Sequence, residues 1–271
     1  MDFKQSKLIL MMAFLALNIF LGYFYIERRN LNQTSIADRI NVQQEMRNDN
    51  ITFDSLDDIK QSLPLVKTSN SEVGQLEANE ITFSPLTNSN SAKPISLVSP
   101  LDIRKSKNEL DFSVIDKFLK EEVNEGTTYQ FVSYYPIKRE VVYAQQVNQV
   151  PIMDGTGQIT FYLNSQNEVA SYTQTVIKQF KSVEEKRVLI SEKKATEILY
   201  LNNLLPRNSE IVSSTLAYYR ILKLENMSVY SPIWYFDIKS DDIITSHRIN
   251  AINGNIITPE VRKINEEMES N

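Results

Sequence analysis

Gln158-Ile-Thr-Phe-Tyr-Leu-Asn164 is the stretch that reveals the fold of this chain, because apolar side chains recur there at every second position. Ile159, Phe161 and Leu163 therefore share one face of an extended strand. The turn residues 164–167 follow, and residues 168–180 are a second run rich in β-branched and aromatic side chains. The pattern predicts an antiparallel hairpin with one buried face.

A helix and another strand are predicted before this hairpin. Gly126 is the expected C′ residue of the helix, and residues 141–150 form the expected strand, which the turn Asp154-Gly-Thr-Gly157 connects to the hairpin. The apolar residues at helical spacing are Phe112, Ile115, Leu119 and Val123.

The same order, a helix and then strands, recurs in the C-terminal part. Ser191 is the expected N-cap of a helix that Pro206 ends. The helix is expected to bury Ala195, Ile198, Leu199 and Leu205. Strands are expected over residues 214–224, 233–238 and 243–251, followed by the tight-turn signal Asn253-Gly254.

We therefore predict an α+β domain of two similar halves, residues 101–182 and 183–265, within a domain that runs from 101 to 271. Each half has a helix packed on an antiparallel sheet. The Ser-, Asn- and Pro-rich residues 63–100 are expected to be irregular with a few short strands. Residues 27–62 are polar with loosely helical apolar positions, which predicts a stalk.

Residues 8–26 predict a transmembrane helix, because only Asn18 and Gly22 among them are not apolar. Such a helix is about 28 Å long and matches the ~30 Å hydrocarbon core of a bilayer. A cleaved signal peptide fits poorly, because its apolar region is shorter, about 7–15 residues, and a cleavage site follows it closely. We expect an uncleaved signal anchor after a short tail, residues 1–7, and the flanking charges leave its orientation open.

The overall charge argues against nucleic acid as a partner. The chain carries a formal net charge of −5 and shows no clustered basic stretch, whereas a protein that neutralises phosphates needs a basic face. The chain has no cysteine, which excludes disulfides, thiol catalysis and thiolate metal sites.

No motif for catalysis, metal or cofactor binding is present in the sequence. His247 is the only histidine, and no HExxH, G-x-S-x-G or glycine-rich phosphate loop occurs. Adjacent acids such as Asp241-Asp242 point to opposite faces of a strand and rarely converge. We therefore expect a protein that is not an enzyme and that has no catalytic, metal or cofactor site.

Four segments of the sequence together span nearly the whole chain and form a recognisable pattern. They are Met1-Asp-Phe-Lys-Gln-Ser-Lys7 before the anchor, Tyr143-Ala-Gln-Gln-Val-Asn-Gln-Val-Pro-Ile152, the hairpin 157–172, and Trp234-Tyr-Phe236 with Ile249-Asn-Ala-Ile-Asn-Gly254. In these segments the sequence resembles the YycI (WalI) family of regulatory proteins from Gram-positive bacteria. Family members commonly carry Trp where Phe3 stands, and residues 69–93 depart from the family pattern.

The resemblance implies a single-pass protein of the cell membrane, with its N-terminus in the cytoplasm and its domain outside. It also implies that the protein acts with a similarly anchored YycH-type partner. Together the two adjust the WalK (YycG) sensor histidine kinase of the two-component system that controls cell-wall metabolism. The sign of this regulation differs among family members.

Two sets of residues are candidate partner contacts. Asn18 and Gly22 lie four residues apart on one face of the predicted membrane helix, where an amide and a small residue favour contact with a second helix. In the domain, one member of each of two aromatic pairs is expected to point outward. These pairs are Tyr218-Tyr219 and Trp234-Tyr235.

Two other functions remain open at this stage. The first is an extracellular sensor on a membrane anchor that binds a ligand or wall polymer in a pocket between the halves. The second is a membrane-tethered hydrolase, which needs a nucleophile and a base that the sequence does not display.

Overall fold

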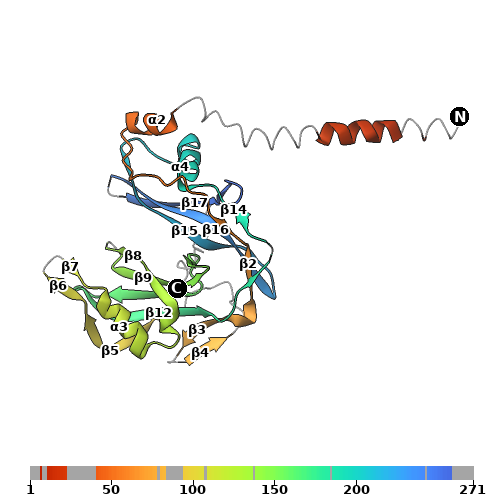
Figure 1. The fold of residues 1–271 in the computed structure, drawn as a ribbon. Coiled ribbons are helices and arrows are strands. Elements are labelled where there is room, and N and C mark those ends of the chain that lie inside the picture. Colours follow the sequence, from red (N-terminus) through yellow and green to blue (C-terminus); the bar gives the residue numbers. More distant parts are fainter. Residues whose placement is uncertain are drawn as a thin grey trace, which may run out of the picture.

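The computed structural model of the protein describes residues 7, 11–22, 41–77, 80–83, 94–106, 109–136, 138–183, 185–241 and 243–257. Beyond the N-terminal helix over residues 11–22, the described residues form two lobes, each built on an antiparallel sheet (Figure 1). The first lobe comprises residues 73–177. The second lobe comprises residues 41–72 and 181–257, so the chain leaves it once and returns.

The first lobe contains an eight-stranded sheet in the order β10-β9-β11-β12-β3-β4, in which β8 also pairs with β9 and β5 with β12. Helix α3 packs on this sheet, and Tyr143 on β9 donates a hydrogen bond to Asp116 on α3 at 2.8 Å. The elements are β3 (Val73–Glu77), β4 (Glu80–Phe83), β5 (Ile95–Asp102), β6 (Arg104–Ser106), β7 (Glu109–Leu110), α3 (Ser113–Glu122), η3 (Gly126–Thr128), β8 (Tyr129–Tyr135), β9 (Glu140–Val147), β10 (Val150–Pro151), β11 (Gln158–Leu163) and β12 (Glu168–Ile177).

The second lobe contains a six-stranded sheet in the order β13-β2-β16-β17-β18, in which β15 also pairs with β16. Helices α2 and α4 lie on one side of this sheet (Figure 1). The elements are α2 (Val42–Asn48), β1 (Ser62–Leu63), β2 (Val66–Ser69), η2 (Asn70–Glu72), β13 (Lys181–Ser182), β14 (Arg187–Val188), α4 (Glu192–Leu201), β15 (Ser209–Lys223), β16 (Met227–Ser240), β17 (Ile243–Asn250) and β18 (Ile256–Ile257).

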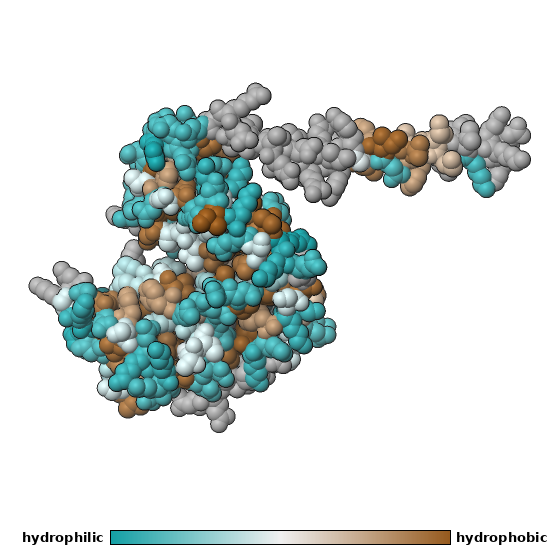
Figure 2. Space-filling model, viewed as in Figure 1, coloured by the Kyte–Doolittle hydropathy of each residue, from teal (hydrophilic) through white to brown (hydrophobic). Residues whose placement is uncertain are grey.

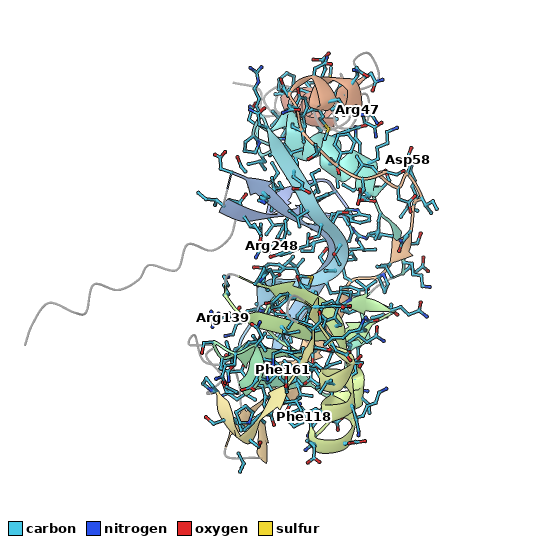
Figure 3. The ribbon with its side chains drawn as sticks, turned by 90° about the vertical axis from the view of Figure 1, so that its left-hand side faces the viewer. Arg47, Asp58, Phe118, Arg139, Phe161 and Arg248 are labelled. Carbon is cyan, nitrogen blue, oxygen red and sulfur yellow. The ribbon has the colours of Figure 1, made fainter. Side chains whose placement is uncertain are left out.

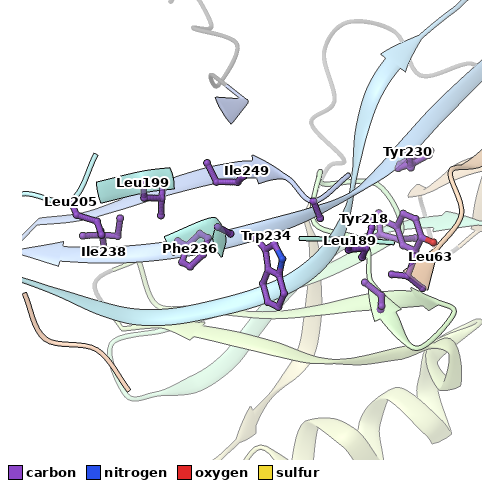
Figure 4. Packing of buried hydrophobic residues seen from close by; sticks show 14 of the residues in the cluster. Leu63, Leu189, Leu199, Leu205, Tyr218, Tyr230, Trp234, Phe236, Ile238 and Ile249 are labelled. Atoms are coloured by element: carbon purple, nitrogen blue, oxygen red, sulfur yellow. The ribbon is translucent and has the colours of Figure 1, made fainter. Parts of the chain in front are cut away.

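The core of the second lobe lies between α4 and β16. Ser191 caps α4 as predicted, accepting a hydrogen bond from the Lys194 amide at 3.2 Å. Figure 4 shows Leu199 of α4 near Phe236 and Trp234 of β16, and all three are buried. The indole of Trp234 also donates a hydrogen bond to the Ile190 carbonyl at 2.9 Å, so the strand and the chain before the helix are joined by a polar contact too.

The predicted α+β class agrees with the structure at a coarse level, because the described chain is mostly sheet with few helices. Ile159 and Phe161 are completely buried, as their alternation predicted. Gly126 is not the C′ residue of α3, which is capped at Val123. A side chain at Gly126 would collide with the Leu119 carbonyl, so this glycine is required for close packing.

The N-terminal part of the domain is more ordered than predicted. Residues 41–62 were expected in the stalk, but they belong to the second lobe, where Met46 of α2 is completely buried. The expected irregular segment contains four strands, each of which is part of one of the two sheets. They are residues 66–69 in the second lobe and residues 73–77, 80–83 and 95–102 in the first. Residues 27–40, 84–93 and 258–271 of the predicted segments lie outside the described residues.

The predicted membrane helix is described in part. Residues 11–22 are helical, and apolar side chains cover much of their surface in Figure 2. Within the part of the chain that the structure describes, no helix reaches the length and apolar character needed to cross a bilayer. The rest of the predicted span, residues 8–10 and 23–26, lies outside the described residues.

Truncating Met46 tests whether α2 belongs to the core. We expect Met46→Ala to lower the free energy of unfolding of the full chain by roughly 2–5 kcal/mol, because it leaves a cavity in a packed interior. Urea unfolding in detergent measures this. Ile59→Ala is the control, because Ile59 is 68% exposed, and it should change stability by less than about 0.5 kcal/mol. Equal stability of the two variants would show that α2 does not pack on the second lobe.

Candidate functional site

The two lobes are joined by the chain around β10. Ile152 forms a parallel bridge with Tyr218 of β15, and the Met153 amide donates to the Tyr218 carbonyl at 2.9 Å. The Tyr218 hydroxyl accepts from the Asn148 side chain at 3.2 Å and donates to the Pro64 carbonyl at 3.0 Å. Tyr218 therefore ties the first lobe to the N-terminal segment of the second.

The turn after β10 carries a buried ion pair across the same junction. Asp154 lies 3.4 Å from the guanidinium of Arg220 on β15, and its other oxygen accepts hydrogen bonds from the amide and hydroxyl of Thr156. The Thr156 hydroxyl is 3.0 Å from the Tyr230 hydroxyl on β16. Burial raises the pKa of Asp154 above its ordinary value, and the Arg220 charge and the Thr156 hydrogen bonds reverse only part of that rise.

A groove lies between the lobes at the other end of β15 and β16. It encloses about 370 Å³, and its walls are mostly apolar. Val212, Ile243 and Ile244 on one wall are 49%, 66% and 43% exposed, which is unusual for large aliphatic side chains grouped together. The first lobe contributes Ser133, Tyr134, Tyr135, Pro136 and Lys138, and the second contributes Val212, Ser213, Asp237, Ile243, Ile244 and Ser246.

The polar end of the groove is the carboxylate of Asp237, which is only 6% exposed. Ser213 on β15 and Ser246 on β17 stand opposite Asp237 in the sheet register and donate hydrogen bonds to it at 3.1 and 2.7 Å. Burial raises the pKa of Tyr135 to about 12, with smaller contributions from Tyr235 and the Asp237 charge. These groups make one polar cluster at the base of an apolar groove.

Arg248 on β17 lies two residues beyond Ser246 and stands opposite Tyr235 in the sheet register. Its guanidinium lies 5.0 Å from the ring centre of Tyr219 and 5.2 Å from that of Tyr235, within the range of cation–π contacts. Figure 3 shows Arg248 on the second lobe, which lies above the first lobe in that view. Burial and the Arg248 charge lower the pKa of the neighbouring His247.

The structure places three of the four predicted aromatic contacts in the interior. Tyr218 is completely buried, and Trp234 and Tyr235 are 8% and 9% exposed. The expectation that one member of the Trp234-Tyr235 pair points outward does not hold, because β16 is covered on both faces. Tyr219 is half-buried, and its contact with a partner stays a prediction.

Asn18 and Gly22 both lie on the described N-terminal helix. The Asn18 side-chain amide donates to the Phe14 carbonyl at 2.8 Å, which leaves its oxygen as an acceptor without a partner among the described residues. Nothing lies within 4 Å of the position that a side chain at Gly22 would occupy. Contact of these residues with a second helix stays a prediction.

A pocket between the halves was expected for a sensor, but the residues that line the groove were not predicted. The signal for its polar base was present in Ile233-Trp-Tyr-Phe-Asp-Ile238, where one carboxylate interrupts an apolar strand. Ser213 and Ser246 carry no signal, because only the strand register brings them to Asp237. In the part of the chain that the structure describes, no group of three His, Asp or Glu residues is placed to hold a metal ion.

The raised pKa of Asp154 predicts a pH dependence of stability. A carboxyl with a raised folded pKa stabilises the fold below its unfolded value, near 3.8, and this contribution is lost as pH rises through the folded pKa. We therefore expect the difference in unfolding free energy, wild type minus Asp154→Asn, to fall as pH increases. Urea unfolding of both chains from about pH 4 to pH 8 measures it. A difference that rises with pH would show that attraction by Arg220 outweighs burial.

Comparison with solved structures gives distant likenesses, including the following two. YycH from Bacillus subtilis is 14% identical, with a TM-score of 0.43, over 78% of this chain and 62% of its own. An uncharacterized protein from Eubacterium rectale is 10% identical, with a TM-score of 0.37, over 59% of this chain and 61% of its own. This chain thus spans about three fifths of each of these proteins.

A search of curated proteins returned no match. The family model described as YycI protein matches residues 30–252 and covers both lobes. The resemblance seen in the sequence is therefore confirmed, and the chain belongs to the YycI family.

Proposed function

We propose that this protein is a single-pass regulator of the cell membrane that, with a YycH-type partner, modulates the WalK (YycG) sensor histidine kinase controlling cell-wall metabolism. The observation that carries the proposal is membership of the YycI family over residues 30–252. In this proposal the N-terminus is cytoplasmic, the two lobes are extracellular, and residues 8–26 cross the bilayer. The protein is a regulator rather than an enzyme and needs no cofactor or nucleic acid.

The features of the described helix support a role in contacts within the membrane. Phe14, Ile19 and Phe20 are each more than half exposed, so the helix has an apolar surface that the domain does not cover. The oxygen of the Asn18 amide has no partner among the described residues, and such an oxygen is costly in hydrocarbon unless another helix supplies a donor. A second helix would therefore gain the most binding free energy on this surface from a hydrogen bond to Asn18.

Weak contacts are sufficient for such regulation. Confinement of both proteins to one membrane raises the effective concentration of each helix for the other. A regulator shifts the kinase between two states only by its difference in affinity for them, and a tenfold shift needs about 1.4 kcal/mol. One or two contacts between membrane helices supply a difference of this size.

Exchanging the anchor tests the partners and the mechanism together. We expect the full chain, purified from membranes of its own cells, to recover a sensor histidine kinase and a YycH-type protein. A chain whose residues 8–26 are replaced by an unrelated membrane helix should lose the kinase. Recovery of neither protein with the native helix would overturn the proposal.

A single substitution tests the amide. We expect Asn18→Leu to reduce recovery of a helix partner about fivefold, because an interhelical hydrogen bond in a membrane contributes roughly 1 kcal/mol. Quantitative mass spectrometry of the co-purified proteins measures this. Ile19→Leu is the matched control and should leave recovery unchanged. Equal recovery with both variants would show that Asn18 makes no partner contact.

The groove between the lobes favours one second candidate function, an anchored sensor of a ligand or wall polymer. Its volume, about 370 Å³, falls within the range of small-molecule sites. A specific rise in melting temperature with cell-wall fragments, abolished by Ile244→Glu, would favour the sensor. An unchanged melting temperature would argue against the sensor and leave only the regulatory proposal.

A further inference from the structure

The two chain connections between the lobes run side by side. One connection leads from β2 to β3 (Figure 1), and the other leads from β12 to β13. The strands at both ends of these connections are paired, with Ile177 opposite Val73 in the first lobe and Lys181 opposite Lys67 in the second. The connections therefore lie next to each other where the chain passes from one sheet to the other.

A small pocket lies at this place, beside the tip of the β15–β16 hairpin. It encloses about 230 Å³, which is less than the ~300–1,000 Å³ of sites that take a drug-sized molecule. The pocket therefore suits a compact chemical group. Its lining residues are Lys67, Thr68, Ser69, Gln179, Lys181, Asn226 and Met227, and none of these described residues is an Asp or a Glu.

The two lysines of the pocket are held on one face of the sheet. Lys67 of β2 and Lys181 of β13 stand directly opposite each other in the antiparallel register. Residues in such positions have Cβ atoms about 4.5–5.5 Å apart, and like charges there destabilise the sheet. Neither ammonium group forms an ion pair within the part of the chain that the structure describes. An anion bound between them would remove the repulsion.

Two carboxamide side chains add neutral donors to the pocket. The side-chain amides of Gln179 and Asn226 make no hydrogen bond with any described residue. The backbone at Asn226 is fixed, because its carbonyl accepts from the Asn70 amide at 3.1 Å and from the Ser69 hydroxyl at 3.3 Å. The pocket thus combines two ammonium groups and two unused amides on paired backbone.

This set of donors matches a phosphate group better than a carboxylate. A phosphate carries between about 1.5 and 2 negative charges near neutral pH and has several acceptor oxygens. Lysine binds phosphate as a point charge, whereas a planar carboxylate is matched best by the guanidinium of arginine. The described lining contains two lysines and no arginine.

We propose that this pocket binds a phosphate group, with Lys67 and Lys181 as its charged ligands and Gln179 and Asn226 as neutral donors. The phosphate is free or belongs to an anionic phospholipid headgroup, since both have this chemistry. A bound phosphate links β2, β13 and the tip of the β15–β16 hairpin, and so stabilises the place where the lobes connect. The inference is independent of the partners named in the proposed function and of the groove.

Thermal unfolding of the full chain in detergent tests the site, with sodium phosphate as the probe. We expect the melting temperature to rise with phosphate relative to sodium chloride of equal ionic strength, because a ligand of the folded state stabilises it. Lys67→Gln with Lys181→Gln should weaken the apparent phosphate affinity at least about tenfold, since both charged ligands are lost. No rise in the native chain would overturn the proposal.

Lys120→Gln with Lys239→Gln is the matched control. It removes the same charge from two exposed positions that do not line the pocket, so the phosphate response should stay that of the native chain. An equal loss of affinity in both double variants would overturn the proposal, because the effect would then come from the net charge of the chain.

Lys181→Glu separates ligand binding from folding. It places a carboxylate opposite Lys67, so we expect a melting temperature in chloride at least as high as that of the native chain. The same substitution should abolish the rise with phosphate, because the new carboxylate repels the anion. A phosphate response equal to that of the native chain would overturn the proposal.

Bilayer nanodiscs distinguish the two sources of the phosphate. A higher melting temperature in phosphatidylglycerol than in phosphatidylcholine discs, lost in Lys181→Glu, would support the site and assign it to a lipid headgroup. A rise that needs added sodium phosphate in both kinds of disc would support the site and assign it to free phosphate. A response to neither phosphate nor phosphatidylglycerol would overturn the proposal.

Discussion

The burial of β16 on both faces is the constraint on which the rest of the structure depends. Residues 228–238 of this strand are buried without interruption. One face packs on α4 through Trp234 and Phe236, and the other face, with Tyr235 and Asp237, looks toward the first lobe. A strand that is apolar on both sides needs cover on both sides, so the second lobe is not complete without the first.

Polar groups within this interior define how the lobes meet. Buried carboxylates are costly unless hydrogen bonds or charges compensate them. Asp154 is compensated by Arg220 and Thr156 at one end of the junction, and Asp237 by two serines at the other. The Asp154–Arg220 pair joins the two lobes, whereas the bonds to Asp237 hold β15, β16 and β17 of the second lobe in one register. The groove lies where this interior reaches the surface.

The position of α2 links the anchor to the sheet. Thr52, which follows α2, exchanges backbone hydrogen bonds with Ser209 and Ile211 at the start of β15. Asp49 accepts a hydrogen bond from Tyr200 at the end of α4 and pairs with Arg207. In the proposed function, a displacement of the membrane helix would therefore act on a segment that is part of the second-lobe core.

Local patterns were sufficient to predict much of the fold. Alternation at Ile159, Phe161 and Leu163 predicted β11, Ser191 predicted the start of α4, and the order of segments predicted the YycI family. The site was not predictable in the same way. Val212 and Ile244 look like ordinary strand residues, and Ser213 and Ser246 become partners of Asp237 only through cross-strand pairing.

What the sequence determined by itself is many of the helices and strands after residue 111, because periodicity and capping act between residues close in the chain. It also determined the absence of thiol chemistry, since no cysteine is present. Only the tertiary structure decided that Val42, Met46 and Ile51 belong to the core, that Trp234 and Tyr235 are both buried, and where the groove lies. These features come from contacts between segments that are distant in the chain. A period of two identifies the faces of a strand but not what covers them.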